Sequence, residues 1–166
     1  MGINKTHSGF YPISHDRPLL EQHIDAYKMK GKLSEPTACP QCKAVFHKGR
    51  WQWMEEPANA HLEICPACHR QNDDFPAGFV SLEGPFYKDN SDEILRTVHN
   101  HEQRERAEHA LQRIIAIDKK DNSALITTTD IHLARGISKA IHNAYKGELD
   151  LHYNAGENQL RAYWKR

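Results

Sequence analysis

The sequence lacks the motifs of the common catalytic classes. It contains no phosphate-binding glycine loop, no serine nucleophile elbow and no HExxH metalloprotease motif. Its carboxylates are numerous but scattered, so no acid–base pair stands out. Long hydrophobic runs are also missing: the longest purely apolar run is Ile114–Ile117, whereas a membrane span needs about 20 residues. These absences predict a non-enzymatic protein with no membrane and no small-molecule substrate as its partner.

Cysteine is scarce, but its arrangement is the strongest signal in the chain. All four cysteines occur in two pairs with the same spacing, Cys39-Pro-Gln-Cys42 and Cys65-Pro-Ala-Cys68. Two thiolates at this spacing can turn around a single ion, and two such pairs complete a tetrahedral all-cysteine site for zinc. The 22 residues between the pairs leave room for a hairpin. The sequence therefore predicts one zinc ion per chain, held by Cys39, Cys42, Cys65 and Cys68.

Other readings of the cysteines explain less of the pattern. The stretch Cys65-Pro-Ala-Cys68-His69 also matches the c-type haem attachment motif, but haem leaves the first pair unexplained. A thioredoxin-like redox site requires a single pair in a βαβ setting. Disulfides require an oxidising compartment, and no signal peptide pattern is present, so we expect reduced cysteines in the cytoplasm. An iron ion uses the same four-thiolate geometry, and the spacing does not distinguish it from zinc.

Neither sign of charge predominates, because 22 Lys and Arg residues balance 22 Asp and Glu residues. The charges are nevertheless segregated along the chain. Residues 1–54 carry 8 basic against 4 acidic side chains, residues 55–93 carry 2 against 9, and residues 94–166 carry 12 against 9. This basic–acidic–basic layout favours a polyanionic partner more than the neutral total suggests.

Composition and periodicity divide the chain into three parts of an α+β protein. Residues 1–36 lack a sustained apolar period and are predicted to form a flexible basic N-terminal arm. Residues 37–84 are predicted to form a small four-cysteine zinc ribbon, in which the metal replaces a core that so short a unit cannot build. Residues 90–166 are predicted to form a separate α/β RNA-binding-like domain. The closing strand of the ribbon is expected from Phe75, Phe79, Val80 and Leu82.

The C-terminal domain is expected to have the order α-β-β-α-β-β. The first helix is predicted from a cap at Ser91 to about Arg113, and a hairpin with strands Ile114–Ile117 and Ala124–Thr128 follows it. The second helix is expected between a cap at residue 129 or 130 and Gly147. A final hairpin is predicted from alternating apolar residues, which are Leu149, Leu151, Tyr153, Leu160, Ala162 and Trp164.

Basic and aromatic residues alternate directly after the first cysteine pair, in residues 46–53. Lys and Arg pair with phosphates, while Trp and Phe stack on unpaired bases. Further basic residues lie in the arm, along one face of the second C-terminal helix and on one face of the last strand. The predicted RNA-binding residues are Lys28, Lys30, Lys32, Lys48, Arg50, Trp51, Trp53, Arg135, Lys139, Lys146, Arg161, Tyr163 and Lys165. Two plainer interpretations stay open: the tryptophans cover one side of the ribbon, and charged outer faces are typical of any amphipathic element.

The arrangement resembles the Nmd-three family, the large-ribosomal-subunit export and maturation adaptors of archaea and eukaryotes, and more closely the short bacterial relatives of that family. The resemblance covers about residues 28–166, and it is carried by Cys39-Pro-Gln-Cys42, Gly49-Arg50-Trp51, Cys65-Pro-Ala-Cys68-His69 and the stretch 128–140. It implies binding of ribosomal RNA on the joining face of the large subunit. This chain has two cysteine pairs where the larger relatives have four, which argues against an export role.

The hypothesis from the sequence is a zinc-stabilised, ribosome-associated RNA-binding factor that acts in subunit assembly or in ribosome hibernation under stress. The alternative is a zinc-ribbon module that binds DNA or protein, such as a transcription regulator. A third possibility is a nuclease or second metal site that uses helix histidines, because His101, Glu105 and His109 share one helix face. A solvated charged face is the plainer interpretation of that stripe.

Overall fold

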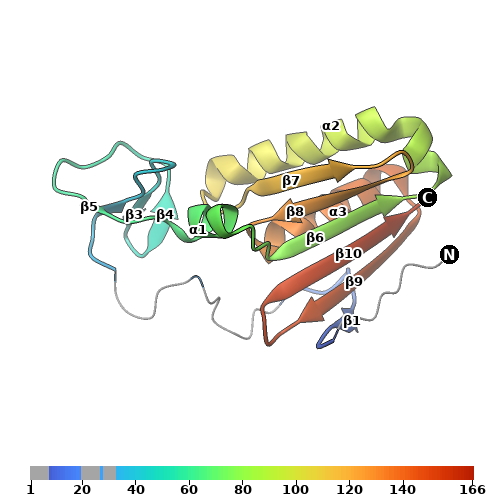
Figure 1. The fold of residues 1–166 in the computed structure, drawn as a ribbon, viewed down its shortest axis with the longest axis horizontal. Helices are drawn as coiled ribbons and strands as arrows, with labels where there is room; N and C mark the ends of the chain where they lie inside the picture. Colours follow the sequence, from blue (N-terminus) through green and yellow to red (C-terminus); the bar gives the residue numbers. More distant parts are fainter. Residues whose placement is uncertain (1–7, 20–26, 28–32) are drawn as a thin grey trace.

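The computed structural model describes residues 8–19, 27 and 33–166. Within these residues, three helices and ten strands form a mixed α/β fold with two sheets (Figure 1). The α+β class expected from the sequence is therefore confirmed. None of the described helices is both long enough and apolar enough to cross a membrane.

The larger sheet has six strands in the order β1-β9-β10-β6-β8-β7. All neighbouring strands are antiparallel except β10 and β6, which run parallel in the middle of the sheet. Its strands are β1 (Tyr11–Ile13), β6 (Gly78–Glu83), β7 (Ile114–Lys119), β8 (Ser123–Thr128), β9 (Glu148–Asn154) and β10 (Gln159–Lys165). Two helices, α2 (Pro85–Glu108) and α3 (Ile131–Tyr145), cover one face of this sheet (Figure 1). We call residues 77–166 together with β1 the six-stranded unit.

The core of this unit lies between the sheet and the two helices. Alternating side chains of the strands, such as Val80 and Ala162, point inward and meet the apolar stripe of α3, which includes Ile137 and Ile141. Trp164 is completely buried among them, and its indole N–H donates to the Lys146 carbonyl at 2.6 Å. The two predicted hairpins form as β7–β8 and β9–β10 because each buries one face against the helices.

The helix boundaries follow local chemistry. Asp130 caps α3, since its carboxylate accepts hydrogen bonds from the backbone N–H groups of His132 (2.8 Å) and Leu133 (3.0 Å). α2 starts at Pro85, earlier than the predicted cap at Ser91, but its backbone leaves helical geometry at Asn90 (φ −126°, ψ 22°). A second helical segment therefore begins next to the predicted cap. Helix α2 also ends before the predicted Arg113, at Glu108, because the backbone leaves helical geometry at His109 (φ −128°, ψ 89°).

The smaller sheet has four short strands in the order β4-β3-β2-β5. They are β2 (Thr37–Ala38), β3 (Val45–His47), β4 (Arg50–Gln52) and β5 (His61–Leu62), and helix α1 (Pro66–Asp73) follows them. This region, residues 33–73, lies at one end of the long axis of the molecule (Figure 1). We call it the metal module.

The predicted boundary between the two parts needs a correction. Residues 78–83 do not close the metal module; they form β6, which pairs with β10 through Val80 and Ala162 and with β8 through Val80 and Ile126. The apolar alternation of this segment correctly indicates a strand that is half buried. That pattern carries no information about which sheet the strand joins, and the central position of β6 is a long-range choice.

Part of the predicted N-terminal arm is also ordered structure. Residues 11–13 form the edge strand β1, which pairs antiparallel with β9, and Tyr11 lies opposite Tyr153. Further along, the Tyr27 hydroxyl donates to the Asp73 carboxylate at 2.9 Å. The expectation of a flexible arm is therefore wrong for residues 11–13. The predicted RNA-binding residues Lys28, Lys30 and Lys32 lie outside the described residues.

Candidate metal centre

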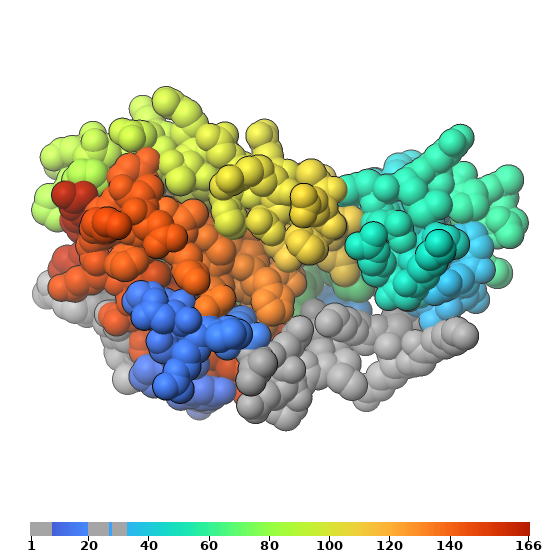
Figure 2. All heavy atoms as spheres, turned by 180° about the vertical axis from the view of Figure 1, so that it is seen from behind, coloured from blue at the N-terminus to red at the C-terminus, as the bar shows by residue number. Residues whose placement is uncertain are grey.

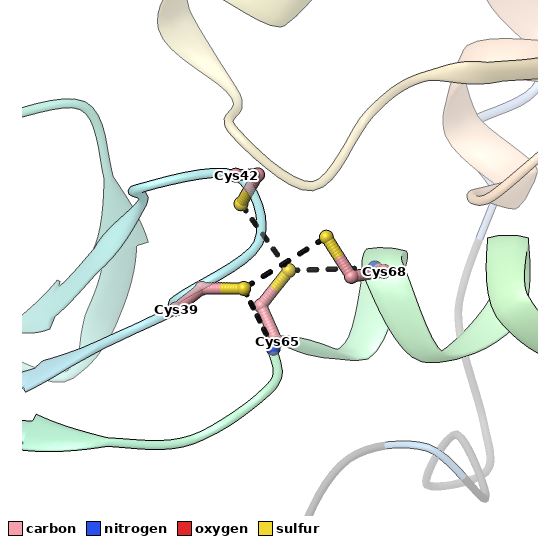
Figure 3. A group of neighbouring side chains, drawn as sticks. All are labelled: Cys39, Cys42, Cys65 and Cys68. Atoms are coloured by element: carbon pink, nitrogen blue, oxygen red, sulfur yellow. Dashed lines mark hydrogen bonds between the residues drawn. The ribbon is translucent and has the colours of Figure 1, made fainter.

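The first cysteine pair sits on a tight turn between β2 and β3. The backbone N–H of Cys39 donates to the Ala44 carbonyl (2.8 Å), and that of Lys43 donates to the Cys39 carbonyl (2.9 Å). Lys43 has a positive φ of 69°, which folds the chain back so that the sulfurs of Cys39 and Cys42 converge (Figure 3). The sequence pattern Cys-Pro-x-Cys thus forms a compact knuckle with its sulfurs on one side (Figure 3).

The second pair sits at the start of α1. Cys65 is the N-cap of this helix, its Sγ accepts a hydrogen bond from the Cys68 backbone N–H (3.4 Å), and Pro66 occupies the first helical position. Pro66 suits that position because its fixed φ matches the helix and it has no N–H to satisfy. The Cys65 backbone N–H also donates to the Cys39 sulfur (3.4 Å). The positive end of the helix dipole favours thiolates here.

The four sulfurs converge on one point (Figure 3). All ligand atoms lie within 4.8 Å of one another, with 3.8 Å between Cys39 and Cys68 and 3.7 Å between Cys42 and Cys65. Sulfurs placed tetrahedrally at about 2.3 Å from a zinc ion are separated by about 3.8 Å, so the spacing fits. Disulfide sulfurs would be about 2.05 Å apart, so the cysteines are free thiols. The cluster is a site for one metal ion.

The surroundings of the sulfurs affect their ionisation. A hydrogen bond from the Cys65 thiol is the main reason why the pKa of Cys42 falls to about 4, and the charge of Arg113 acts in the same direction. The same hydrogen bond and burial raise the pKa of Cys65, and burial raises the pKa of Cys68. Cys42 and Cys65 therefore titrate as a pair, and a divalent ion would complete the deprotonation.

A buried arginine of the six-stranded unit reaches into the cluster. The guanidinium of Arg113 donates to Cys42 Sγ at 3.1 Å, to Cys68 Sγ at 3.2 Å and more weakly to Cys65 Sγ at 3.6 Å. Burial alone would lower the pKa of Arg113, but the hydrogen bond to Cys68 and the charges of Cys65 and Cys42 raise it. Arg113 is 2 % exposed, and it remains a cation at the place where the metal module meets the six-stranded unit.

Sequence reasoning missed Arg113 as a functional residue. It stands directly before a predicted strand and is 45 residues from Cys68, so no local spacing connects it to the cysteines. The sequence prediction extends the first helix to about Arg113, whereas α2 ends at Glu108. The turn that brings Arg113 to the sulfurs is therefore not predicted.

The predicted RNA-binding residues of the metal module fall into two groups. Lys48 and Arg50 are exposed at the turn between β3 and β4. Trp51 packs instead against the cysteine cluster and against Phe46, with ring centroids 5.7 Å apart. Trp53 is 37 % exposed, and its indole N–H donates to the Arg106 carbonyl on α2 at 2.7 Å. Both tryptophans thus have structural partners, as the plainer interpretation allowed.

The basic stripe on α3 is interrupted at its first residue. Arg135 donates to the backbone carbonyls of His15 (3.0 Å) and Arg17, so its guanidinium holds the N-terminal segment against the helix. Figure 2 shows residues 8–19 in blue lying over part of α3 in orange. Lys139 is half-buried and Lys146 is exposed at the end of the helix. Arg135 therefore has a structural partner, and its predicted role in RNA binding stays a prediction.

Two of the three predicted residues of the last strand have partners within the protein. Arg161 lies over the Phe79 ring at 4.1 Å, and Tyr163 is buried and contacts His152 with ring centroids 5.6 Å apart. Lys165 is exposed, but the strand register places it beside Glu83 and Glu148. The cationic character of this face is partly offset by those carboxylates.

The suggested second metal site does not form. Among residues 8–19, 27 and 33–166, the four cysteines are the only group of three or more His, Cys, Asp or Glu residues whose ligand atoms converge. His101 faces α3, where a Cβ at Gly136 would lie 2.6 Å from its Nε2 atom. His109 lies 3.9 Å from Glu105 as an ordinary helix-surface pair. The stripe of these three residues is thus part helix packing and part solvated surface.

Comparisons with known proteins identify no relative. No protein-family model matches the chain, and searches of curated proteins and of solved structures find no match.

Proposed function

We propose that the protein is a zinc-stabilised RNA-binding factor that acts on the large ribosomal subunit. Four thiolates fill the tetrahedral shell of a zinc ion and leave no position for a substrate. Such a closed site holds a fold together and does not perform chemistry. The protein therefore acts by binding, and its metal keeps a small binding surface rigid.

The observation that carries the proposal is the exposed cationic turn between β3 and β4. The carboxylate of Glu35 accepts hydrogen bonds from the backbone N–H groups of Lys48 (3.2 Å) and Gly49 (2.9 Å). These two bonds fix the conformation of the turn. The side chains of Lys48 and Arg50 extend from it and are exposed. Exposed cations on a fixed turn suit the phosphate backbone of a nucleic acid.

The glycine at the tip also suits close approach by a partner. Gly49 has a positive φ of 78°, which an L side chain rarely adopts, and a Cβ there would have no neighbour within 4 Å. The space around the turn is therefore open.

The large subunit enters the proposal through the resemblance of the cysteine pairs and of Gly49-Arg50-Trp51 to the Nmd-three family. Binding on the joining face would keep the two subunits apart. That outcome serves either subunit assembly or the storage of idle ribosomes, and both roles require the same contact.

Sedimentation with ribosomal subunits tests this proposal. We expect the zinc-loaded protein to co-sediment with the large subunit at about 50 mM salt and to be largely released by about 200 mM, because several phosphate contacts are lost together. The variant Lys48→Glu/Arg50→Glu should remain at the top of the gradient. The matched control Lys119→Glu/Lys120→Glu reverses two exposed charges at the turn between β7 and β8. This variant should sediment with the large subunit as the wild type does. A wild-type protein that stays unbound at low salt would contradict the proposal.

A second candidate is a module that binds a protein, and one observation favours it. Leu62 on the edge strand β5 is 64 % exposed and Met54 is 39 % exposed, and both belong to the metal module. Large apolar side chains at this exposure are often part of a protein contact. If Leu62→Ser abolishes ribosome association while the double charge reversal leaves it intact, protein recognition is the better description. Preference for duplex DNA over ribosomes in a competition assay would support the transcription-regulator alternative.

A further inference from the structure

Within the part of the chain that the structure describes, Arg113 is a buried cation whose negatively charged partners are the cysteines. Its guanidinium donates to three of the four sulfurs and to two neutral oxygens, those of Ala110 (2.9 Å) and Gln71 (3.4 Å). Among the described residues, no carboxylate forms an ion pair with it. A buried guanidinium is unfavourable unless a negative charge compensates it. The thiolates of the metal centre are therefore part of what makes this burial possible.

Arg113 in turn compensates the negative charge of the metal centre. A zinc ion with four thiolates is doubly negative, and this cluster is largely shielded from water, since Cys39 and Cys65 are 0 % exposed. One guanidinium with N–H groups directed at the sulfurs reduces that excess charge. Donors to coordinating atoms orient the ligands and strengthen metal binding.

The backbone of Arg113 is fixed to the six-stranded unit. Its N–H donates to the hydroxyl of Thr129 (2.9 Å), and its carbonyl accepts from the backbone N–H of Thr129 (2.9 Å). The next residue, Asp130, is the cap of α3. The Trp53 ring of the metal module lies 5.5 Å from the guanidinium. Arg113 thus contacts the metal ligands and the Trp53 ring through its side chain and the residue before the α3 cap through its backbone.

We propose that Arg113 is a positioning residue of the metal centre, which stabilises the bound zinc and couples metal loading to the attachment of the metal module to the six-stranded unit. When the metal leaves, the sulfurs are no longer held at one point, and the guanidinium loses its fixed acceptors while its backbone stays anchored to Thr129. The junction then loosens on the side of the module. This inference rests on the four-cysteine site and is independent of RNA binding.

If Arg113 had only a packing role, its replacement would affect stability differently. If Arg113 only fills space and bonds to Ala110 and Gln71, its replacement lowers the melting temperature by the same amount with and without metal. A coupled residue gives unequal losses, because its contribution depends on the charge of the loaded centre. The difference between the two losses measures the coupling.

The test compares zinc affinity in matched variants of the full chain. Wild-type protein, Arg113→Gln, Arg113→Lys and Arg106→Gln are loaded with zinc and titrated with a chromophoric chelator. Arg106 is the control, because it lies 5.8 Å from the same Trp53 ring and contacts no sulfur. We expect about 10- to 100-fold weaker zinc binding for Arg113→Gln, an intermediate value for Arg113→Lys, and less than about a twofold change for Arg106→Gln.

Two further readouts separate coordination from folding. In cobalt-substituted protein, the thiolate-to-metal charge-transfer band should shift in Arg113→Gln and stay in place in Arg106→Gln. The gain in melting temperature on adding zinc should be smaller in Arg113→Gln than in the wild type. Wild-type zinc affinity in Arg113→Gln, or equal melting losses with and without metal, would overturn the proposal. Should Arg113→Gln not fold, Arg113→Lys decides, since wild-type zinc affinity in that variant would show that the forked donors are not needed.

Discussion

The metal module and the six-stranded unit are stabilised by different interactions, a metal centre in the first and an apolar core in the second. The six-stranded unit has a contiguous apolar core that includes Ile126, Ile137 and Trp164. The buried cluster of the metal module consists of Cys39, Cys65, Cys68 and Ala67, with a few apolar residues at its margin. In one region hydrophobic burial is sufficient, whereas in the other an ion must take the place of the core. The two regions should therefore respond to different perturbations.

Metal removal should produce the largest effect and should be confined to one region. Structural zinc contributes about 10–16 kcal/mol of apparent binding free energy in small zinc peptides, far more than this module can gain from apolar burial. We expect chelation, or the substitution Cys65→Ser, to expose the backbone amides of β2, β3, β4 and β5 to rapid hydrogen exchange. The amides of β6, β8 and β10 should remain protected. Equal loss of protection in both regions, measured by hydrogen-exchange mass spectrometry, would contradict the comparison.

A cavity in the apolar core should have the reverse pattern. Ile137 is completely buried, and Ile137→Ala should lower the free energy of unfolding of the six-stranded unit by about 2–5 kcal/mol, through lost burial and the cavity that remains. Zinc affinity should not change, because Ile137 is not part of the cysteine cluster. Denaturant unfolding and chelator titration measure the two quantities. The exposed α3 variant Asn143→Ala is the control, and a large loss of zinc affinity in Ile137→Ala would show that the two regions are one cooperative unit.

Loss of the α3 cap should have a smaller effect. Asp130→Ala removes the acceptor for the N–H groups of His132 and Leu133 and should cost about 1 kcal/mol of stability. Asp130→Asn keeps an acceptor and should recover most of it. Thermal unfolding of the three proteins measures the difference. Equal melting temperatures for Asp130→Ala and wild type would mean that the cap does not stabilise the helix.

The smallest expected effect is a pH dependence at His101. Burial holds the pKa of His101 below its usual value, Arg104 acts in the same direction, and Glu105 opposes it. The unfolded chain therefore takes up a proton at this position more readily, and the stability that the neutral ring contributes is lost as the pH falls through about 6.5. We expect His101→Gln to lose less stability than the wild type between about pH 7.5 and 5.5. Parallel pH profiles of the two proteins would count against this assignment.

The sequence predicts the parts of the site that depend on local spacing. Cys39 and Cys42, like Cys65 and Cys68, need only one turn of the chain to share an ion, so their role as metal ligands can be inferred from the spacing. The cap at Asp130 and the two C-terminal hairpins are likewise local, because a helix start and an apolar alternation are properties of neighbouring residues.

The parts that the sequence does not predict depend on distant partners. β6 joins β10, about half the chain away, and nothing in Gly78–Glu83 specifies that partner. Arg113 is recognisable only once the fold has brought it to the sulfurs. Arg135 fits a basic stripe in the sequence, yet in the fold it binds the backbone of the N-terminal segment. Charge and periodicity identify candidate binding residues and candidate strands. The tertiary structure determines which residues each of them contacts.

Native mass spectrometry of the purified full chain tests the central claim most directly. The account predicts a single species that carries one zinc ion, and a Cys65→Ser variant that has lost it. It also predicts that the four thiols of the loaded protein resist alkylation until a chelator is added. A folded, metal-free wild-type protein whose four cysteines react at once with an alkylating reagent would contradict the account.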